Sequence, residues 1–439
     1  MGPEAPLKAS QARPADAPGR RSLAEWLAHI EGQHHRSIDL GLERLRQVSQ
    51  RLQQRQACPL ILVGGTNGKG STCAMLERIL RCAGYRVGLY TSPHLLRYNE
   101  RVRIDGVAAT DELLCQSFAR VEAARDEVPL TYFEFGTLAA WEAFSASGLD
   151  AVILEVGLGG RLDATNLYAP DVSVVTTVDL DHMDFLGADR EAIGFEKAGI
   201  FRSGKVAICG DEHPPASLLA HAAATGTDLR CLGRDFGFLR QEGQWQYRGQ
   251  QGRRSGLAFP ALRGRRQLAN AACALAALDA LRDRLPVAMQ DIRRGLAEVE
   301  LAGRFQVLPG RPTVVLDVAH NPQAARTLAE NLGDMAFHPV TWAIFGMLKD
   351  KDIAGVAAAM APRVDRWLPV SLDGPRGASA AELTEILGRI GIPGPLPSFA
   401  SPQAALAQVR EMAGEDDRIV VFGSFLTVAD TLRALGRTP

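Results

Sequence analysis

Apolar and polar positions alternate along the chain in a pattern that separates short strands from longer helices. Short apolar runs, typical of buried strands, occupy residues 59–63, 86–90, 150–156, 171–178 and 205–210. Around them, apolar residues recur at the i, i+3 and i+4 spacing of a helix, in residues 22–56, 72–84, 111–126, 134–147, 189–198 and 267–281. This alternation predicts a mostly parallel sheet that is covered by helices on both faces.

A second alternating series begins after residues 301–305. Its strands are expected at 313–318, 340–346, 364–370 and 418–423, with helices from about 322 and 351, two more before 418 and one at the end. Residues 229–262 separate the two series, and their glycine, glutamine, arginine and isolated aromatic residues predict a short β insertion. Because 439 residues exceed the usual size of one hydrophobic core, we expect two α/β domains with a boundary at about residue 300.

The composition excludes several classes of protein. Lys and Arg number 49 against 50 Asp and Glu, which gives no indication of a nucleic-acid partner. The seven cysteines form no C-x-x-C pair, which favours reduced thiols in the cytoplasm over disulfides or a zinc ribbon. No apolar run reaches the about 18–20 residues of a membrane span. Residues 1–21 lack the apolar core of a secretory signal, and we expect a disordered tail rather than a transit peptide.

The segment "LVGGTNGKGSTC", residues 62–73, predicts a phosphate-binding loop. A glycine-rich turn between a strand and a helix directs backbone N–H groups and the helix dipole at an anion, and Lys69 adds a mobile positive charge. The loop departs from G-x-x-x-x-G-K-[ST], because Val63 replaces the first glycine and Gly70 separates Lys69 from Ser71. A purely structural turn is the alternative. No N-K-x-D stretch that would read guanine is present, so ATP is favoured over GTP.

Polar clusters follow other strands of the same predicted sheet, at the edge where open α/β sheets bind ligands. Glu155 ends an apolar strand, where a carboxylate is costly unless it is paired or bound to a metal. His182 lies between Asp181 and Asp184, and Ser92 follows a neighbouring strand. Ser92, Glu155 and His182 are therefore candidate metal ligands, although an ordinary surface or core histidine explains His182 equally well. Magnesium prefers oxygen ligands, so an imidazole would indicate tolerance for manganese.

Ten segments occur along the chain in this order: "GGTNGKGST", "TSPHLLRYNERVRIDG", "TYFEFGTLAA", "EVGLGGRLDATN", "DHMDFLG", "EKAGIFRSGK", "LAGRFQ", "DVAHNP", "GMLKDKD" and "GSFLTV". Together they resemble the bacterial dihydrofolate synthase/folylpolyglutamate synthase family of the Mur ligase superfamily, from about residue 22 to 430. The resemblance implies a P-loop ATP-binding domain of the Mur ligase central type at 22–299. It also implies a smaller, Rossmann-like C-terminal domain of the glutamate-ligase type at 300–439.

The resemblance also implies an activity. ATP would phosphorylate a carboxylate of a pterin substrate, and the amino group of L-glutamate would displace phosphate from the acyl phosphate. The acceptors would be 7,8-dihydropteroate and reduced folates, with Mg²⁺ or Mn²⁺, and a monovalent cation as a further candidate. We expect a cytoplasmic monomer with small-molecule partners and neither nucleic acid nor membrane. The alternatives are a monofunctional folylpolyglutamate synthase, another Mur-type amino-acid ligase, or a nucleotide-dependent switch without ligase chemistry.

Individual roles follow from the resemblance, position by position. The ATP-binding residues would be Thr66, Asn67, Gly68, Lys69, Gly70, Ser71, Asn270, Arg304 and Asp317. The metal ligands would be Ser92, Glu155 and His182. The catalytic residues would be Lys69, His182, Lys197 and His320, with Lys197 carrying a carbamate. The pterin-side residues would be Asp39, Leu40, Gly41, Thr131, Tyr132, Phe133, Glu134, Leu162, Asp163 and Ala164.

Three of these roles have ordinary alternatives. Lys197 alone would be read as a common helix lysine, and its carbamate requires a neutral amine with a depressed pKa. Phe133 could stack on a flat ring, but an aromatic residue on a helix more often belongs to a core. His320 in "DVAHNP" faces the acyl phosphate or glutamate, or is a simple loop histidine.

Overall fold

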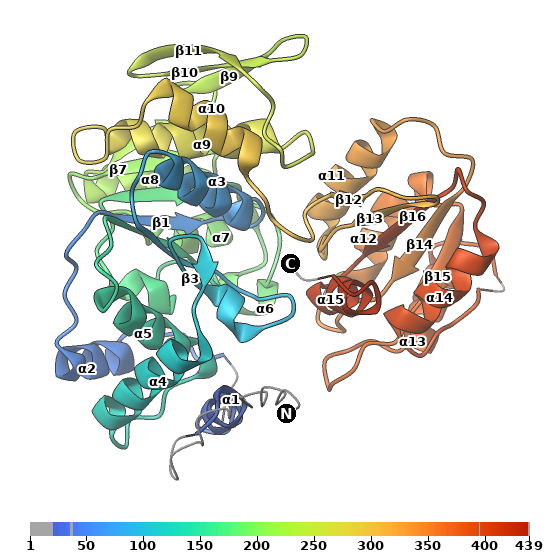
Figure 1. Ribbon diagram of the computed structural model, residues 1–439, viewed down its shortest axis with the longest axis horizontal. Helices are drawn as coiled ribbons and strands as arrows, with labels where there is room; N and C mark the ends of the chain where they lie inside the picture. The colour runs from blue at the N-terminus through green and yellow to red at the C-terminus, as the bar shows by residue number, and fades with distance from the viewer. Residues whose placement is uncertain (1–20, 36–37, 395, 438–439) are drawn as a thin grey trace, which may run out of the picture.

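The computed structural model describes residues 21–35, 38–394 and 396–437. In this part of the chain a larger and a smaller β-sheet lie side by side, each with its own helices (Figure 1). The mixed fold class expected from the alternating pattern is confirmed. The predicted disordered tail lies outside the described residues, except for Arg21. No helix among the described residues is both long and apolar enough to cross a bilayer.

The larger sheet has the strand order β4-β3-β2-β5-β1-β6-β7-β8. Its parallel strands are β1 (Leu60–Gly64), β2 (Val87–Tyr90), β5 (Ala151–Glu155), β6 (Val172–Val175), β7 (Val206–Cys209) and β8 (Asp228–Cys231). At one edge, β3 (Val102–Ile104) and β4 (Val107–Ala108) are antiparallel additions that the sequence pattern did not predict. They are too short to give a periodicity signal.

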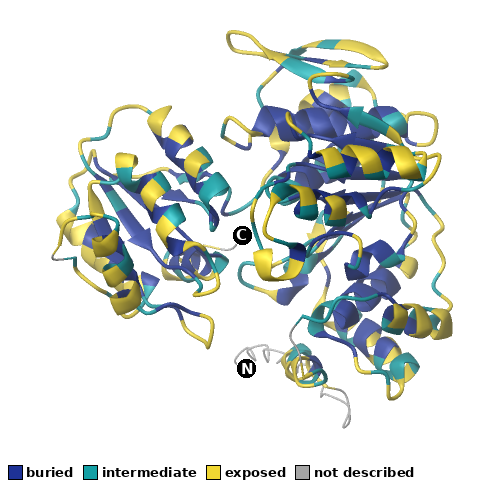
Figure 2. Cartoon of the chain, turned by 180° about the vertical axis from the view of Figure 1, so that it is seen from behind, coloured by how far each residue is buried: buried dark blue, intermediate teal, exposed yellow. Residues whose placement is uncertain are grey.

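Both faces of this sheet are covered, as its continuous apolar strands predict. Along β1, Leu60 and Leu62 belong to one core, whereas Ile61 and Val63 belong to the other. The helices of the first core are α1 (Leu23–Glu31), α2 (Glu43–Leu52), α4 (Asp111–Arg125), α5 (Tyr132–Ser145), α7 (Arg190–Ala198) and α8 (Ala216–Thr225). The helices of the second are α3 (Lys69–Cys82), α9 (Gln267–Ala280) and α10 (Met289–Glu298). Figure 2 shows the buried residues along the sheet and its inward helix faces.

The predicted β insertion is confirmed, although it divides between two sheets. Its first strand, β8, joins the edge of the larger sheet, whereas β9 (Gly237–Arg240), β10 (Trp245–Gly249) and β11 (Gly252–Leu257) form an antiparallel sheet over α9 (Figure 1). Trp245 and Tyr247 anchor this sheet in the second core. Helices α8 and α10 had not been predicted.

The smaller sheet has the order β12-β13-β16-β14-β15. Its strands are β12 (Gln306–Leu308), β13 (Thr313–Leu316), β14 (Thr341–Phe345), β15 (Arg366–Pro369) and β16 (Arg418–Phe422), with β12 antiparallel to β13. Its helices are α11 (Pro322–Gly333), α12 (Ile353–Met360), α13 (Ala380–Arg389), α14 (Pro402–Met412) and α15 (Phe425–Ala434). The chain passes from one sheet to the other between α10 and β12. The domain boundary at about residue 300 stays a prediction.

Candidate active site

A cleft lies between the two sheets, lined by residues from both. On the side of the larger sheet, the cleft is lined by the loop after β1 and by residues at or after the ends of β2, β5 and β6. The smaller sheet's side adds the segment after β13 and the beginning of α11. The predicted site residues among its walls are Thr66, Asn67, Gly68, Lys69, Gly70, Ser71, Ser92, Glu155, His182, Lys197, Asn270, Arg304, Asp317 and His320.

The glycine-rich loop is held by the residues that follow β6. The Thr66 N–H donates to the Thr177 carbonyl over 2.7 Å, and the Asn67 N–H donates to the Thr177 hydroxyl over 3.0 Å. The Thr176 hydroxyl donates to the Asn67 carbonyl over 2.7 Å. Gly65 has φ +136°, and a Cβ there would lie 2.0 Å from Thr176 Oγ1, so only glycine fits. The strand predicted to run to residue 178 therefore ends at 175, because the threonines support the loop.

Lys69 and the first turn of α9 complete the loop's surroundings. The Lys69 ammonium donates to the carbonyls of Gly65, over 3.0 Å, and Thr66, over 3.3 Å. Gln267 donates to the Ser71 hydroxyl over 3.3 Å and accepts from the Asn270 amide over 3.0 Å. The loop, its lysine and the beginning of α3 thus have the arrangement of an anion site at a helix N-terminus.

Glu155, at the end of β5, is 5% exposed and accepts a hydrogen bond from the Ser92 N–H over 3.3 Å. Burial raises the pKa of Glu155, while the nearby positive charges of Lys69 and Arg304 lower it. Burial also lowers the pKa of His182 to about 4, so its imidazole is neutral and able to bind a metal. No three His, Cys, Asp or Glu side chains converge as a preformed metal site in the described residues. The oxygen donors of Ser92 and Glu155 with one neutral imidazole nevertheless fit Mg²⁺ or Mn²⁺.

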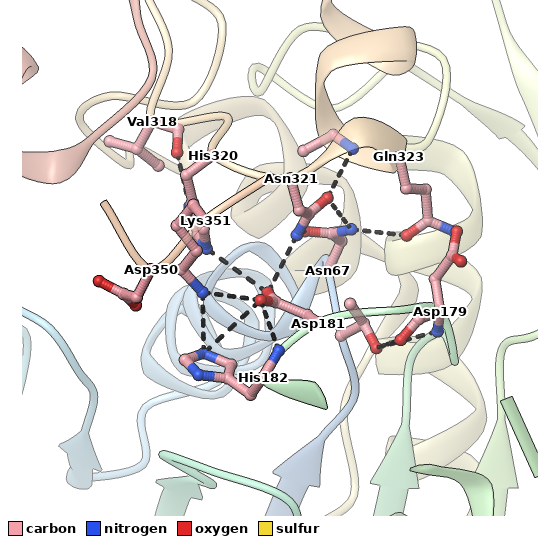
Figure 3. Close-up of polar contacts among 12 residues, drawn as sticks. Asn67, Asp179, Asp181, His182, Val318, His320, Asn321, Gln323, Asp350 and Lys351 are labelled. Carbon is pink, nitrogen blue, oxygen red and sulfur yellow. Dashed lines mark hydrogen bonds and ion pairs between the residues drawn. The ribbon is translucent and has the colours of Figure 1, made fainter. Parts of the chain in front are cut away.

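An ion-pair network joins the two sides of the cleft (Figure 3). The Lys351 ammonium lies 2.7 Å from Asp181 Oδ1 and donates to His182 Nε2 over 3.2 Å. Asp181 Oδ2 also accepts from the Asn321 amide over 3.2 Å and lies 3.6 Å from His320 Nε2. Burial opposes ionisation of Asp181, but His320 and Lys351 hold its pKa well below its ordinary range. The Asp181 carboxylate is therefore the centre of this network.

The beginning of α11 also contacts the phosphate loop directly. The Asn67 side-chain amide donates to Gln323 Oε1 over 2.5 Å and to Asn321 Oδ1 over 3.2 Å (Figure 3). His320 lines the cleft and donates from Nδ1 to the Val318 carbonyl over 2.9 Å, while its Nε2 faces the Asp181 carboxylate. The first turn of α11 thus touches both the phosphate loop and the Asp181 network.

Lys197 lies in the last turn of α7 and is 4% exposed. Burial and, to a lesser extent, the positive charge of the nearby Lys69 lower its pKa to about 7, against the opposing effect of Asp181. A substantial fraction of this amine is therefore neutral near pH 7.

Arg304 and Asp317 line the cleft on the side of the smaller sheet. Asp317 accepts from the N–H groups of Phe305, over 2.9 Å, and Ala319, over 2.8 Å. Burial raises the pKa of Asp317, whereas Arg304 lowers it. The Arg304 guanidinium lies 4.9 Å from the centre of the Phe425 ring. This arrangement offers a cation and a fixed carboxylate opposite the phosphate loop.

Comparison with known proteins identifies the family. The models of the Mur ligase middle domain and the Mur ligase glutamate ligase domain match residues 63–278 and 303–425. A relative from Escherichia coli (strain K12), named dihydrofolate synthase/folylpolyglutamate synthase, is 45% identical over 94% of this chain and 95% of its own length. The chain belongs to the dihydrofolate synthase/folylpolyglutamate synthase family of the Mur ligases.

Solved structures agree with this family. The Escherichia coli protein in complex with DHPP and ADP matches with a TM-score of 0.90 and 45% identity, over 95% of this chain and 98% of the other. A bifunctional folylpolyglutamate synthase/dihydrofolate synthase with Mn, AMPPNP and L-glutamate bound matches with a TM-score of 0.88 and 45% identity, over the same shares. Family members of this fold thus bind nucleotide and divalent metal.

The residues predicted for the pterin side are set apart from the cleft described above. Asp39–Gly41, Thr131–Glu134 and Leu162–Ala164 are absent from its walls in the described part of the chain. Asp163 is 2% exposed and accepts from the Leu158 N–H and from Thr165. Leu158 lines the cleft, so Asp163 contacts its wall directly, over 2.8 Å. Phe133 also lies against the wall, because a Cβ on the cleft residue Gly157 would lie 2.6 Å from its ring. These segments therefore adjoin the cleft through Asp163 and Phe133.

Several residues that line the cleft or contact its lining were missed by sequence reasoning. Asp181 and Lys351 lie in the quoted segments "DHMDFLG" and "GMLKDKD", but nothing in either segment indicates that they pair across 170 residues of sequence. Gln267 and Asn321 begin helices, where polar residues are common as caps. For Asp181, Asn321 and Lys351 the available signal was a charged or amide residue a few positions after a predicted strand.

Proposed function

We propose that this protein is an ATP-dependent ligase that joins L-glutamate to 7,8-dihydropteroate, forming dihydrofolate, and to reduced folates, forming folylpolyglutamates. The observation that carries the proposal is the phosphate loop with Lys69, faced across one cleft by Arg304 and Asp317. Relatives of the same family, matched over nearly the whole chain, have this name.

The chemistry requires activation before ligation, because an amine cannot expel oxide from a carboxylate. The acceptor carboxylate attacks the γ-phosphorus of ATP, and ADP leaves with the electrons of the broken P–O bond. The glutamate amine then attacks the acyl carbon, phosphate leaves, and the amine loses a proton as the amide forms. Such phosphoryl transfer depends on position and charge neutralisation more than on covalent catalysis.

Each part of the cleft has a role in this sequence. The backbone of Thr66–Ser71 and the Lys69 ammonium would hold the phosphates, and Asn270, Arg304 and Asp317 would hold the rest of ATP. Ser92, Glu155 and His182 would bind Mg²⁺, with Mn²⁺ as a substitute. When bound, this ion neutralises phosphate charge, and its positive charge would offset the cost of burying Glu155. His320 would face the acyl phosphate or the incoming glutamate.

We also propose that Lys197 carries a carbamate. Its neutral amine would attack carbon dioxide, forming an N–C bond and losing one proton. The buried side chain, which is a cation when protonated, would then be an anionic carbamate. The depressed pKa of about 7 supports this reaction, because the amine must be neutral to react.

Two further properties belong to the same proposal. The seven cysteines are free thiols, which suits the reducing cytoplasm. Both walls of the cleft come from one chain, which supports a monomer that is complete for catalysis. A monovalent cation near the phosphates remains part of the hypothesis.

Mass spectrometry of the products tests the function directly. The protein would be supplied with ATP, Mg²⁺ and L-glutamate, and dihydropteroate and tetrahydrofolate would be offered separately. We expect at least one added glutamate on each acceptor and one ADP for each amide formed. Product from tetrahydrofolate alone would establish the monofunctional alternative. Steady ADP release without acceptor, or no product with either, would refute the ligase.

A further inference from the structure

Two segments assigned above to the pterin side meet at one arginine, Arg44, that no prediction included. Arg44 lies in the first turn of α2, three residues after Gly41. Its Nη1 donates to Asp39 Oδ2 over 2.6 Å, and its Nη2 donates to the Asp39 carbonyl over 2.9 Å. Nη2 also donates over 3.0 Å to Glu134 Oε1, which lies 90 positions away in the sequence. One guanidinium therefore links both segments.

The Glu134 carboxylate in turn fixes the beginning of α5. Its second oxygen, Oε2, accepts from the Thr131 N–H over 2.8 Å, and the Glu134 N–H donates to the Thr131 hydroxyl over 3.3 Å. These reciprocal bonds are a capping box. The Glu134 side chain is only 4% exposed, so its charge requires a partner, and Arg44 supplies it.

The first turn of α5 also carries the contact with the nucleotide cleft. Phe133 precedes Glu134, and its ring lies against the Cα of Gly157, where a Cβ would be 2.6 Å from Phe133 Cζ. Gly157 lines the cleft. The orientation of this turn, fixed through Glu134, therefore decides where the Phe133 ring stands at the cleft wall.

We propose that Arg44 is a positioning residue for the acceptor, clamping Asp39–Gly41 onto the first turn of α5 and so shaping the acceptor's side of the site. This inference rests on the proposed function. It requires arginine rather than lysine, because a planar fork can serve two carboxylates and a carbonyl together, whereas an ammonium is a single point charge. The competing explanation is that Arg44 only ties the N-terminal helices to the fold.

Steady-state kinetics of Arg44→Met and Arg44→Lys separates these explanations. In Arg44→Met we expect KM for the pterin acceptor to rise about tenfold or more, because charge-assisted hydrogen bonds are lost. KM for ATP, and kcat at saturating acceptor, should stay within about twofold of the unaltered protein, since the nucleotide side is untouched. Arg44→Lys should show an intermediate rise in acceptor KM.

The chain offers a matched control on the same helix. Arg46 is 53% exposed and pairs only loosely, over 3.4 Å, with the exposed Glu43. Arg46→Met removes an equal charge from α2 and should leave both KM values unchanged. Nucleotide affinity, measured by calorimetry with ADP, shows whether each variant keeps its nucleotide site.

The possible outcomes are distinct. An unchanged acceptor KM in Arg44→Met overturns the inference, as does a parallel loss of ADP affinity and acceptor affinity. If Arg44→Met does not fold, Arg44→Lys decides, and an acceptor KM equal to that of the unaltered protein overturns the inference. Failure of the unaltered protein to use either acceptor would instead refute the proposed function, so the two failures are distinguishable.

Discussion

The ammonium of Lys351 lies 2.7 Å from the carboxylate of Asp181, so that a lysine after β14 closes an ion pair with a loop after β6. The two side chains are 8% and 12% exposed, which makes this a largely desolvated pair between the two sides of the cleft. Removing one partner of such a pair costs much more free energy than removing one partner of a surface pair, because the other charge is left desolvated and unpaired.

Lys351→Met should therefore loosen the contact between the two sides. We expect kcat/KM for ligation to fall about tenfold or more, and the radius of gyration of the unliganded protein to increase in small-angle scattering. Lys349→Met is the matched control, because Lys349 is 51% exposed and pairs with the surface residue Glu382. Equal effects of the two substitutions would show that the Lys351 pair has no special role.

Lys69→Ala should abolish turnover through lost phosphate binding. We expect the rate of acceptor-dependent ADP release to fall about 100-fold or more, as when a preorganised charge is removed from a reacting group. Lys205→Ala is the control, because Lys205 precedes β7 and pairs with Asp171 at 50% exposure. A normal rate in Lys69→Ala would mean that the glycine-rich loop is only structural.

Glu155→Gln should separate metal binding from folding. The substitution keeps the shape of the side chain but removes the charge, so Mn²⁺ affinity in the presence of AMPPNP should fall at least about tenfold, measured by electron paramagnetic resonance. Glu77→Gln provides a comparison, because burial raises the pKa of Glu77 in α3 as well, but Glu77 pairs with Arg103 of β3. Unaltered Mn²⁺ affinity in Glu155→Gln would exclude this residue as a ligand.

The carbamate on Lys197 should be visible by carbon-13 NMR after incubation with labelled bicarbonate. An ordinary lysine, with a pKa of 10.5, is almost entirely protonated at pH 7.5, whereas a pKa of about 7 leaves most of the Lys197 amine neutral. Protonation competes with carbon dioxide for this amine. The signal should therefore be present at pH 8, weaken as the pH falls through 7 and be absent in Lys197→Met. A bare amine in an active preparation would refute the carbamate.

A second contact between the two sides involves Arg265 and Asp334, which form two hydrogen bonds of 2.6 Å. The Arg265 backbone N–H also donates to Asn331 Oδ1 over 3.0 Å. Arg265 lies just before α9, whose first residue is Gln267. Because the pair is exposed, Arg265→Glu should raise KM for ATP only about twofold to fivefold. Combining it with Asp334→Arg should restore KM. A double variant no better than the single one would show that the pair does not couple the two sides.

The alternating pattern of apolar runs determined the fold class and most elements, because buried parallel strands and amphipathic helices have distinct periods. Elements too short to show a period were missed, as with β3 and β4, and helices α8 and α10 were missed as well. Helix α3 also begins earlier than its apolar pattern, at Lys69, since the loop glycines end in a left-handed residue, Gly68, that caps it. The local spacing of apolar residues predicts the type of an element but not the residues at which it begins and ends.

The sequence by itself also determined the phosphate loop and the candidate residues at strand ends, since the carboxyl ends of parallel strands share one edge of a sheet. Only the tertiary structure decided which distant residues meet. Lys351 and Asp181 pair because the packing of two separate cores brings their loops together, and Arg44 joins Asp39 to Glu134 because α2 and α5 share one core. Such contacts depend on the geometry of whole domains, which no local pattern of residues specifies.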